Sequence, residues 1–155
     1  TLKLFADSSY GKHPKPMAGH CVFMNGTPVA WLAKKLKIVP LSSCEAETAA
    51  LCVGCKALKF CQNFLCELGS IATVPMIVYT DSDAARLVIV NPGTTARTKH
   101  YESWMQYCRE LYLKHVIGIE WIASMYQTAD IFTKPLDKTT FLRHRAQLMF
   151  EPDPN

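Results

Sequence analysis

The sequence predicts an α/β fold built on one mixed sheet, and two observations carry that prediction. Short apolar runs separated by turn signals fill residues 1–35, a pattern typical of antiparallel strands. Longer helical patterns then alternate with apolar runs, so the later strands would reach the sheet by crossovers. With 155 residues, 49% of them hydrophobic and 19% charged, we expect one domain over residues 1–150 with a sizeable core, followed by a disordered tail at 151–155.

Three antiparallel strands are expected first. The stretch "LKLFADSSYG" alternates like a strand and meets a turn at Gly11, after which the Pro-rich "KHPKP" interrupts pairing. In "GHCVFMNGTPVAWLAKK", two apolar runs flank Asn25 and Gly26, which is a strong hairpin signal. These runs would form the antiparallel half of the sheet.

The remaining elements alternate between helix and strand. A long helix is expected from Ser42 to Gly69, with capping-box spacing between Ser42 and Glu45 and a glycine at its end. After it we expect a strand at 76–81, a short helix to about residue 90, a second long helix at roughly 98–114, a strand in "IGIEWIA" and a last helical segment from about residue 129. This order completes a sheet with helices packed on both faces.

Composition narrows the class of protein. No apolar run approaches the roughly 20 residues of a transmembrane helix, and the N-terminus lacks the apolar segment of a signal peptide, which favours a cytoplasmic protein without a membrane partner. The chain begins at Thr1 in the lead-in to a strand, so we interpret it as a domain of a longer polypeptide. A formal charge of +4 suits an anionic partner.

Five of the seven cysteines fall in the first helix without a second metal-type pair, and we interpret them as reduced core residues.

One acid in the long helix stands out from its neighbours. At 100° per residue, Glu47 aligns with the apolar stripe of Leu51 and Leu58 that should lie on the sheet, whereas Glu45 falls on the wetter face with Lys56. An acid on an apolar stripe is costly to bury unless it is paired or binds a metal. Its plainer interpretation is a carboxylate that reaches solvent at the edge of the helix.

Three further acids stand at element ends. In period-2 counting, Asp7 shares a face with Phe5 and should point where core residues point. Asp81 ends the strand of "MIVYTDSDAA", followed by Ser82 as a helix cap, and Asp130 stands where the last helical segment begins. Asp81 and Asp130 also fit an ordinary role at a helix start, where the dipole favours negative charge.

Carboxylates that lie close together would indicate a metal site. Carboxylates within a few ångströms repel one another, so the arrangement needs protons or cations at neutral pH. Oxygen-rich sites suit Mg²⁺ or Mn²⁺, and two such ions can activate water and stabilise the leaving oxygen in phosphodiester hydrolysis. The four acids therefore indicate a candidate two-metal site.

The sequence resembles the ribonuclease H domain of copia-type LTR retrotransposon polyproteins. The matching segments, in order, are "FADSSYG" with "GHCVFMNGTPVAWLAKK", "PLSSCEAETAAL", "VYTDSDAA", "NPGTTARTKHYE" and "QTADIFTKPL". The resemblance spans residues 2 to 150, and "LSSxEAE", "RTKH" and "ADIFTK" together are highly specific.

This resemblance implies the ribonuclease H fold and an endonuclease that cuts the RNA strand of RNA:DNA hybrids. It implies two Mg²⁺ ions, for which Mn²⁺ would substitute, and no small-molecule cofactor. The family's four acids fall on Asp7, Glu47, Asp81 and Asp130. The implied partner is the reverse transcriptase domain of the same polyprotein, within a cytoplasmic retrotransposon particle.

Substrate contacts and one departure from the family pattern follow from the same resemblance. Relatives carry a histidine shortly before the last acid, thought to assist leaving-group or product release, and "IASMYQTAD" has none. His100 would either serve a related purpose or simply face solvent or nucleic acid. Further candidates for phosphate or 2′-hydroxyl contacts are Ser8, Ser9, Ser82, Arg97 and Lys99, and also Lys34, Lys35 and Lys37.

Two other functions stay open from the sequence. The chain would alternatively be a catalytically silent subdomain that grips hybrid or braces a reverse transcriptase, although clustered carboxylates do not help a surface that only binds an anion. It would also fit another nuclease of the same fold, such as a transposase or integrase. The position of Glu47 ahead of the third carboxylate in chain order disfavours the latter.

Overall fold

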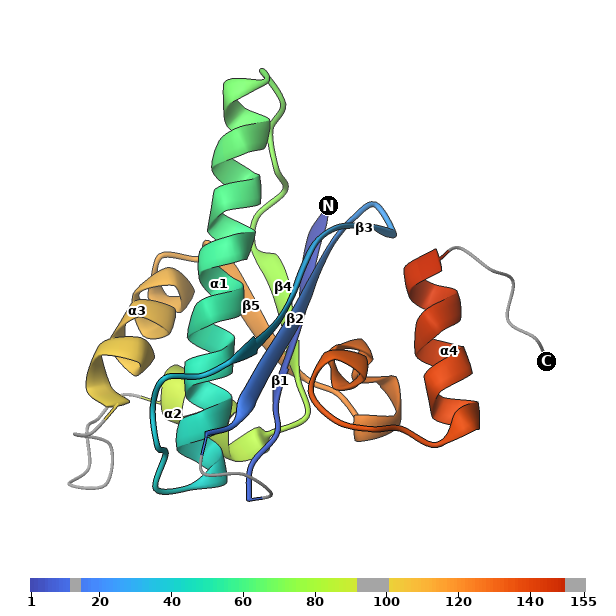
Figure 1. Cartoon of the computed structure of the whole chain (residues 1–155). Helices are drawn as coiled ribbons and strands as arrows, with labels where there is room; N and C mark the ends of the chain where they lie inside the picture. Colours follow the sequence, from blue (N-terminus) through green and yellow to red (C-terminus); the bar gives the residue numbers. More distant parts are fainter. Residues whose placement is uncertain (12–14, 92–100, 150–155) are drawn as a thin grey trace.

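A five-stranded mixed sheet organises the computed structural model, which describes residues 1–11, 15–91 and 101–149 (Figure 1). The strands are β1 (Leu2–Ser8), β2 (Met17–Met24), β3 (Thr27–Lys35), β4 (Met76–Thr80) and β5 (Ile117–Trp121), in the spatial order β3-β2-β1-β4-β5. Neighbours among the first three strands are antiparallel, whereas β4 is parallel to β1 and β5 is parallel to β4. The predicted fold class is therefore confirmed.

The β2–β3 hairpin forms where the sequence predicts it. Asn25 and Gly26 lie between the strands with φ angles of 51° and 89°. Positive φ at both central residues is what a tight hairpin turn needs, and Asn followed by Gly is the pair that tolerates it best. The turn thus sets the pairing of β2 with β3.

Three helices cover one face of the sheet: α1 (Ser43–Glu67), α2 (Asp83–Val90) and α3 (Glu102–Leu113) (Figure 1). Ser42 caps α1, because its hydroxyl accepts the Glu45 N–H at 3.2 Å. Leu4 and Leu58 are fully buried in the core beneath α1. Gly54 lets helix and sheet approach closely, since a Cβ there would lie 3.0 Å from the Leu4 side chain.

The last part of the chain covers the opposite face, and the single helical segment expected from residue 129 is wrong in detail. Two short 3₁₀ helices, η2 (Ser124–Tyr126) and η3 (Thr128–Phe132), precede a separate helix α4 (Lys138–Met149). Pro135 separates them because proline lacks the N–H that a continuous helix needs and restricts the residue before it. Figure 1 shows α4 across the sheet from α1, and η3 packs against β1 and β2.

Two predictions about side-chain faces are wrong. Glu45 is only 6% exposed instead of lying on a wet face, because its carboxylate accepts the Leu41 N–H at 2.8 Å and α3 covers that side of α1. Asp7 and Phe5 do share a face, but it is not the face under α1, where Leu2, Leu4 and Ala6 point. Asp7 is nevertheless 1% exposed, since η3 covers it.

The cysteines are free thiols, as expected, and only some belong to the core. Cys52 and Cys55 of α1 are buried, Cys44 and Cys61 are half-buried, and Cys66 is exposed. The core interpretation therefore holds for the first half of α1, which lies on the sheet. No helix in the described ranges is long and apolar enough to cross a membrane.

Candidate active site

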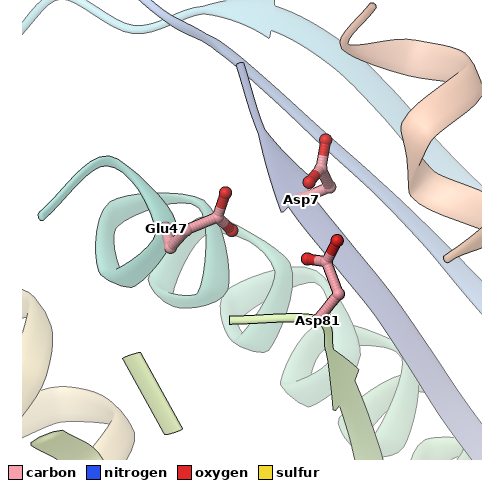
Figure 2. A group of neighbouring side chains, drawn as sticks. All are labelled: Asp7, Glu47 and Asp81. Carbon is pink, nitrogen blue, oxygen red and sulfur yellow. The ribbon is translucent and has the colours of Figure 1, made fainter. Parts of the chain in front are cut away.

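Three carboxylates converge where the parallel strands β1 and β4 end. Asp7 is the penultimate residue of β1, and Asp81 directly follows β4, whose Tyr79 is in register with Phe5. Glu47 enters from the first turns of α1 (Figure 2). Each of the three acids offers an oxygen within 4.8 Å of the other two. The carboxyl ends of adjacent parallel strands are where open α/β sheets place ligand sites.

Glu47 is held by the strand that it faces. The Ser8 hydroxyl donates to Glu47 Oε1 at 2.8 Å, and the Ser8 N–H contributes a longer bond of 3.3 Å. The other oxygen, Oε2, is buried without a hydrogen-bond partner among the described residues. Burial, and then the Asp7 charge, raise the pKa of Glu47 to about 8. One carboxylate oxygen is thus fixed and the other is left for a ligand.

Asp7 lies at the centre of the site. Its Oδ2 accepts a hydrogen bond from the Thr133 hydroxyl, and its Oδ1 lies 3.6 Å from Lys134 Nζ. Burial raises the pKa of Asp7 to about 7 against the opposing effect of the Lys134 charge, and the Asp130 charge raises it further. Asp7 is therefore shared between the Glu47 side and the η3 side of the site.

Asp130 stands on the η3 side, outside the group of three acids. It is the third residue of η3, and its Oδ1 lies 3.1 Å from Lys134 Nζ. Burial raises the pKa of Asp130 even though Lys134 lowers it. Asp130 and Asp7 are therefore joined through the ammonium of Lys134.

Two residues position η3 beside β1 and β2. Gln127 is fully buried, and its Nε2 donates to the Ala6 carbonyl of β1 at 3.0 Å. Gly19 of β2 pairs with Asp7 across the strands, and a Cβ there would lie 2.7 Å from side-chain atoms of both Phe132 and Thr133. The absence of a side chain at position 19 lets η3 bring its polar residues to Asp7.

The serines predicted to contact substrate all make hydrogen bonds within the domain. Ser8 holds Glu47, Ser9 Oγ accepts the Met17 N–H at 3.0 Å, and Ser82 Oγ accepts the Ala85 N–H at 3.2 Å. The expected cap at Ser82 is thus present at the start of α2. The other sets of predicted contacts are Arg97, Lys99 and His100, which lie outside the described residues, and Lys34, Lys35 and Lys37, which are exposed at and beyond the end of β3.

Sequence reasoning missed several residues that shape the site. Lys134 and Thr133 follow Asp130 within "ADIFTK", and the spacing of four residues was a signal that Lys134 could reach Asp130. Trp121 donates its indole N–H to the Asp81 carbonyl at 3.1 Å, and the residue is 54% exposed. Nothing local marks Gln127 as an anchor, because its partner is far away in the chain.

The site suits a hard divalent cation. Three acidic side chains crowd together, and the raised pKa values of Asp7 and Glu47 express the cost of holding those two ionised without a cation. The buried Oε2 of Glu47 has no hydrogen-bond partner among the described residues, and the three candidate ligands are carboxylate oxygens, which Mg²⁺ and Mn²⁺ prefer. Asp7, Glu47 and Asp81 therefore fit a metal, and Asp130 is connected to Asp7 through Lys134.

Solved structures define the class of fold. An N-terminal RNase H domain from Mycobacterium tuberculosis matches 93% of this chain and 95% of its own, with a TM-score of 0.61 and 15% identity. LC11-RNase H1, solved in complex with an RNA/DNA hybrid, matches 86% of this chain and 94% of its own, with a TM-score of 0.62 and 15% identity. The chain has the ribonuclease H fold.

Sequence relatives then specify the kind of ribonuclease H-like domain. No family model matches the chain. The Pol polyprotein of transposon RE1 from Arabidopsis thaliana is 30% identical over 123 residues, and that of transposon TNT 1-94 from Nicotiana tabacum is 30% identical over 127 residues; the matches cover 79% and 82% of this chain. The chain spans only 8% to 10% of the length of these relatives. It is a ribonuclease H-like domain of the type found in copia-type retrotransposon Pol polyproteins.

Proposed function

We propose that this chain is a metal-dependent ribonuclease H that cleaves the RNA strand of RNA:DNA hybrids during reverse transcription of a retrotransposon. The observation that carries the proposal is the convergence of Asp7, Glu47 and Asp81 at the ends of β1 and β4. A nuclease gains from clustered carboxylates because they hold the ions that react with phosphodiesters. A surface that only binds nucleic acid would be weakened by them.

Each acid has its own part in the proposal. Asp7, Glu47 and Asp81 would hold one divalent ion, and Asp7 with Asp130 would hold a second. Mg²⁺, with Mn²⁺ as a substitute, would supply activation of the attacking water and stabilisation of the leaving oxygen. Ser8 fixes Glu47 Oε1, which would leave Oε2 available to a bound ion.

The related polyproteins extend the proposal to the partner of this domain and to its location in the cell. The related Pol polyproteins are about ten times longer than the matched segment, so we propose that the reverse transcriptase domain of the same polyprotein is the neighbour of this domain. Residues 1–150 would act as one domain with 151–155 as a tail, within a cytoplasmic retrotransposon particle. The RNA/DNA hybrid bound to LC11-RNase H1 supports hybrid as the substrate class.

Replacing Asp81 by Asn tests the assignment most directly. The side chain lies at the end of a strand and is half-buried, so the change removes charge with little effect on packing. We expect cleavage of a labelled hybrid in Mg²⁺ to fall on the order of a hundredfold or more, with a thermal unfolding midpoint in chelator no lower than that of the unaltered chain, because the Asp81 charge repels Asp7 and Glu47. Asp83→Asn is the matched control, because Asp83 is exposed and pairs with Arg86.

The same assay separates the alternatives. Full Mg²⁺-dependent cleavage by Asp81→Asn would contradict the proposed site. Hybrid binding without cleavage by the unaltered chain, in either Mg²⁺ or Mn²⁺, would favour a catalytically silent subdomain. Cleavage of duplex DNA in preference to hybrid would indicate another nuclease of the same fold.

A further inference from the structure

A lysine ammonium lies inside the carboxylate site. Lys134 Nζ lies 3.1 Å from Asp130 Oδ1 and 3.6 Å from Asp7 Oδ1, and its side chain is only 35% exposed. Although burial lowers its pKa, the charges of Asp7 and Asp130 raise it above the ordinary value. The lysine side chain thus supplies the opposing charge for both acids at this end of the site.

At the other end of the site, no cation among the described residues is paired with Glu47, although the Lys134 charge also interacts with Asp81. The groups that shift the pKa of Glu47 are Asp7, Asp81 and Ser8, and none of them is cationic. Asp7 contributes to both ends, because it lies near Glu47 and Asp81 and also faces Lys134. One end of the site thus carries its own cation, whereas Glu47 has none among the residues that the structure describes.

A divalent ion held by Asp7 and Asp130 would need the region that the ammonium occupies. Two cations a few ångströms apart repel strongly in a partly buried site. The lysine stem is flexible, and its partial exposure allows the ammonium to move toward solvent. Occupation of this end by a metal therefore requires Lys134 to leave it.

We propose that Lys134 is a built-in counter-cation that competes with the divalent ion at the Asp7–Asp130 end of the site. The inference rests on the proposed function, in which the four acids hold two divalent ions. It adds an order of loading: the Glu47–Asp81 end fills first, and the Asp7–Asp130 end fills only when Lys134 is displaced. Lys134 also keeps the metal-free domain folded by compensating two buried acids.

Metal binding without nucleic acid tests the inference. Mn²⁺ is titrated into the chain and followed by calorimetry and by electron paramagnetic resonance of the free ion. We expect two classes of site in the unaltered chain, and we expect Lys134→Met to tighten the weaker class by about tenfold or more, the order expected when a full charge about 4 Å away is removed. The tighter class should change by less than about threefold, since it lies farther from the ammonium.

Two variants control for charge and for folding. Lys138→Met removes the same charge from an exposed position in α4 and should leave both classes unchanged. Lys134→Gln removes the charge but keeps a polar N–H donor at the position, so it serves if Lys134→Met does not fold without metal. Both Lys134 variants should unfold at lower temperature than the unaltered chain in chelator and regain most of the loss in Mn²⁺.

The outcomes distinguish this inference from the proposed function. The proposed competition would be overturned if both Lys134 variants bound Mn²⁺ at the weaker class of site with unchanged affinity, or if both lost that class of site. Cleavage of hybrid by the unaltered chain would still support the proposed function in that case. Tightening of the weaker class in a chain that never cleaves hybrid would support the competition and contradict the proposed nuclease.

Discussion

The two ends of the carboxylate site neutralise their charge in different ways. At the first end, Glu47 is held by hydrogen bonds from Ser8, and its second oxygen has no protein partner among the described residues. At the second end, Asp130 and Asp7 share the ammonium of Lys134. Both ends bury acids, yet within the described part of the chain only the second end shows an ion pair.

The two ends also differ in which elements of the fold support them. The Glu47 end is supported by α1 and β1, elements that also form the main core. The Asp130 end depends on η3, a short 3₁₀ helix tied to the sheet by Gln127 and by close packing on Gly19. The first end is therefore the more rigid, and the second can be disturbed separately.

Gly19→Ala should disturb the second end of the site by displacing η3. Of the variants in this comparison, it should lose the most stability and cleavage. The new Cβ would lie 2.7 Å from Phe132 and Thr133, so η3 must shift away from β2. Such overpacking costs typically about 1–3 kcal/mol, measurable by urea unfolding, and cleavage of hybrid should fall with it. A variant with normal stability and normal cleavage would show that η3 does not need this close approach.

A matched control keeps the η3 packing intact. Gly118→Ala places a Cβ in β5 at 3.3 Å from the flexible end of Ile77, where a small adjustment suffices. We expect a smaller loss of stability than for Gly19→Ala and no loss of Mn²⁺ binding. The pair separates a general cost of adding a methyl group to the sheet from a specific effect on the site.

The pH dependence of stability should reveal the difference between the two ends, because no cation among the described residues shifts the pKa of Glu47. Burial raises the folded-state pKa of Asp7 to about 7 and that of Glu47 to about 8, above their values near 4 in an unfolded chain. The folded state therefore binds more protons between pH 4 and pH 8, and the free energy of unfolding in chelator should fall as pH rises through that window. Glu47→Gln should flatten the fall by on the order of 1 kcal/mol per pH unit.

Glu45→Gln provides the control for this titration. It makes the same change two residues earlier in α1, where the carboxylate accepts the Leu41 N–H outside the cluster. Its unfolding curves, measured in chelator across the same pH range, should keep the slope of the unaltered chain. Parallel curves for the Glu47→Gln variant and the unaltered chain would refute the raised pKa values as the cause.

Ser8→Ala should have the smallest effect, because it removes one support of Glu47 and leaves every acid in place. The Ser8 hydroxyl donates the shorter of the two hydrogen bonds to Glu47 Oε1. Loss of a residue that orients a metal ligand typically costs about 10–100-fold in metal affinity, and we expect the lower end of that range because the Ser8 N–H remains. Calorimetric titration with Mn²⁺ measures it, and Ser9→Ala is the neighbouring control.

The Ser8 result bears on which end loads first. A tenfold weakening confined to the tighter class of Mn²⁺ site would assign that class to the Glu47 end. Weakening of the looser class instead would place the first ion beside Asp130 and contradict the inferred role of Lys134. The experiment thus connects the support of one carboxylate to the order in which the site fills.

Much of the fold was readable because its signals are local. The Asn25–Gly26 turn, the cap at Ser42 and the apolar stripe of α1 each depend on residues a few positions apart, so the hairpin and the helix were predicted with nearly their observed bounds. The break at Pro135 was also local, but the pattern around Asp130 was interpreted as one continuous helix.

Side-chain surroundings were not readable in the same way. Periodicity places Asp7 and Phe5 on one face of a strand without saying which helix covers that face. The same limit applies to Glu45, whose burial comes from Leu41 and from the packing of α3. Both predictions failed because the covering element is distant in the chain.

The sequence by itself determined the α/β order of elements, the four acids at element ends and the resemblance that connects them to a ribonuclease H. Only the tertiary structure decided that Asp7, Glu47 and Asp81 meet within 4.8 Å and that Lys134 lies between Asp7 and Asp130. The physical reason is that strand register and the seating of η3 arise from contacts between residues far apart in the chain: Lys3 pairs with Ile77 between β1 and β4, and Gln127 donates to the Ala6 carbonyl across 121 residues. No local pattern encodes those contacts, and they set the charge balance on which the chemistry depends.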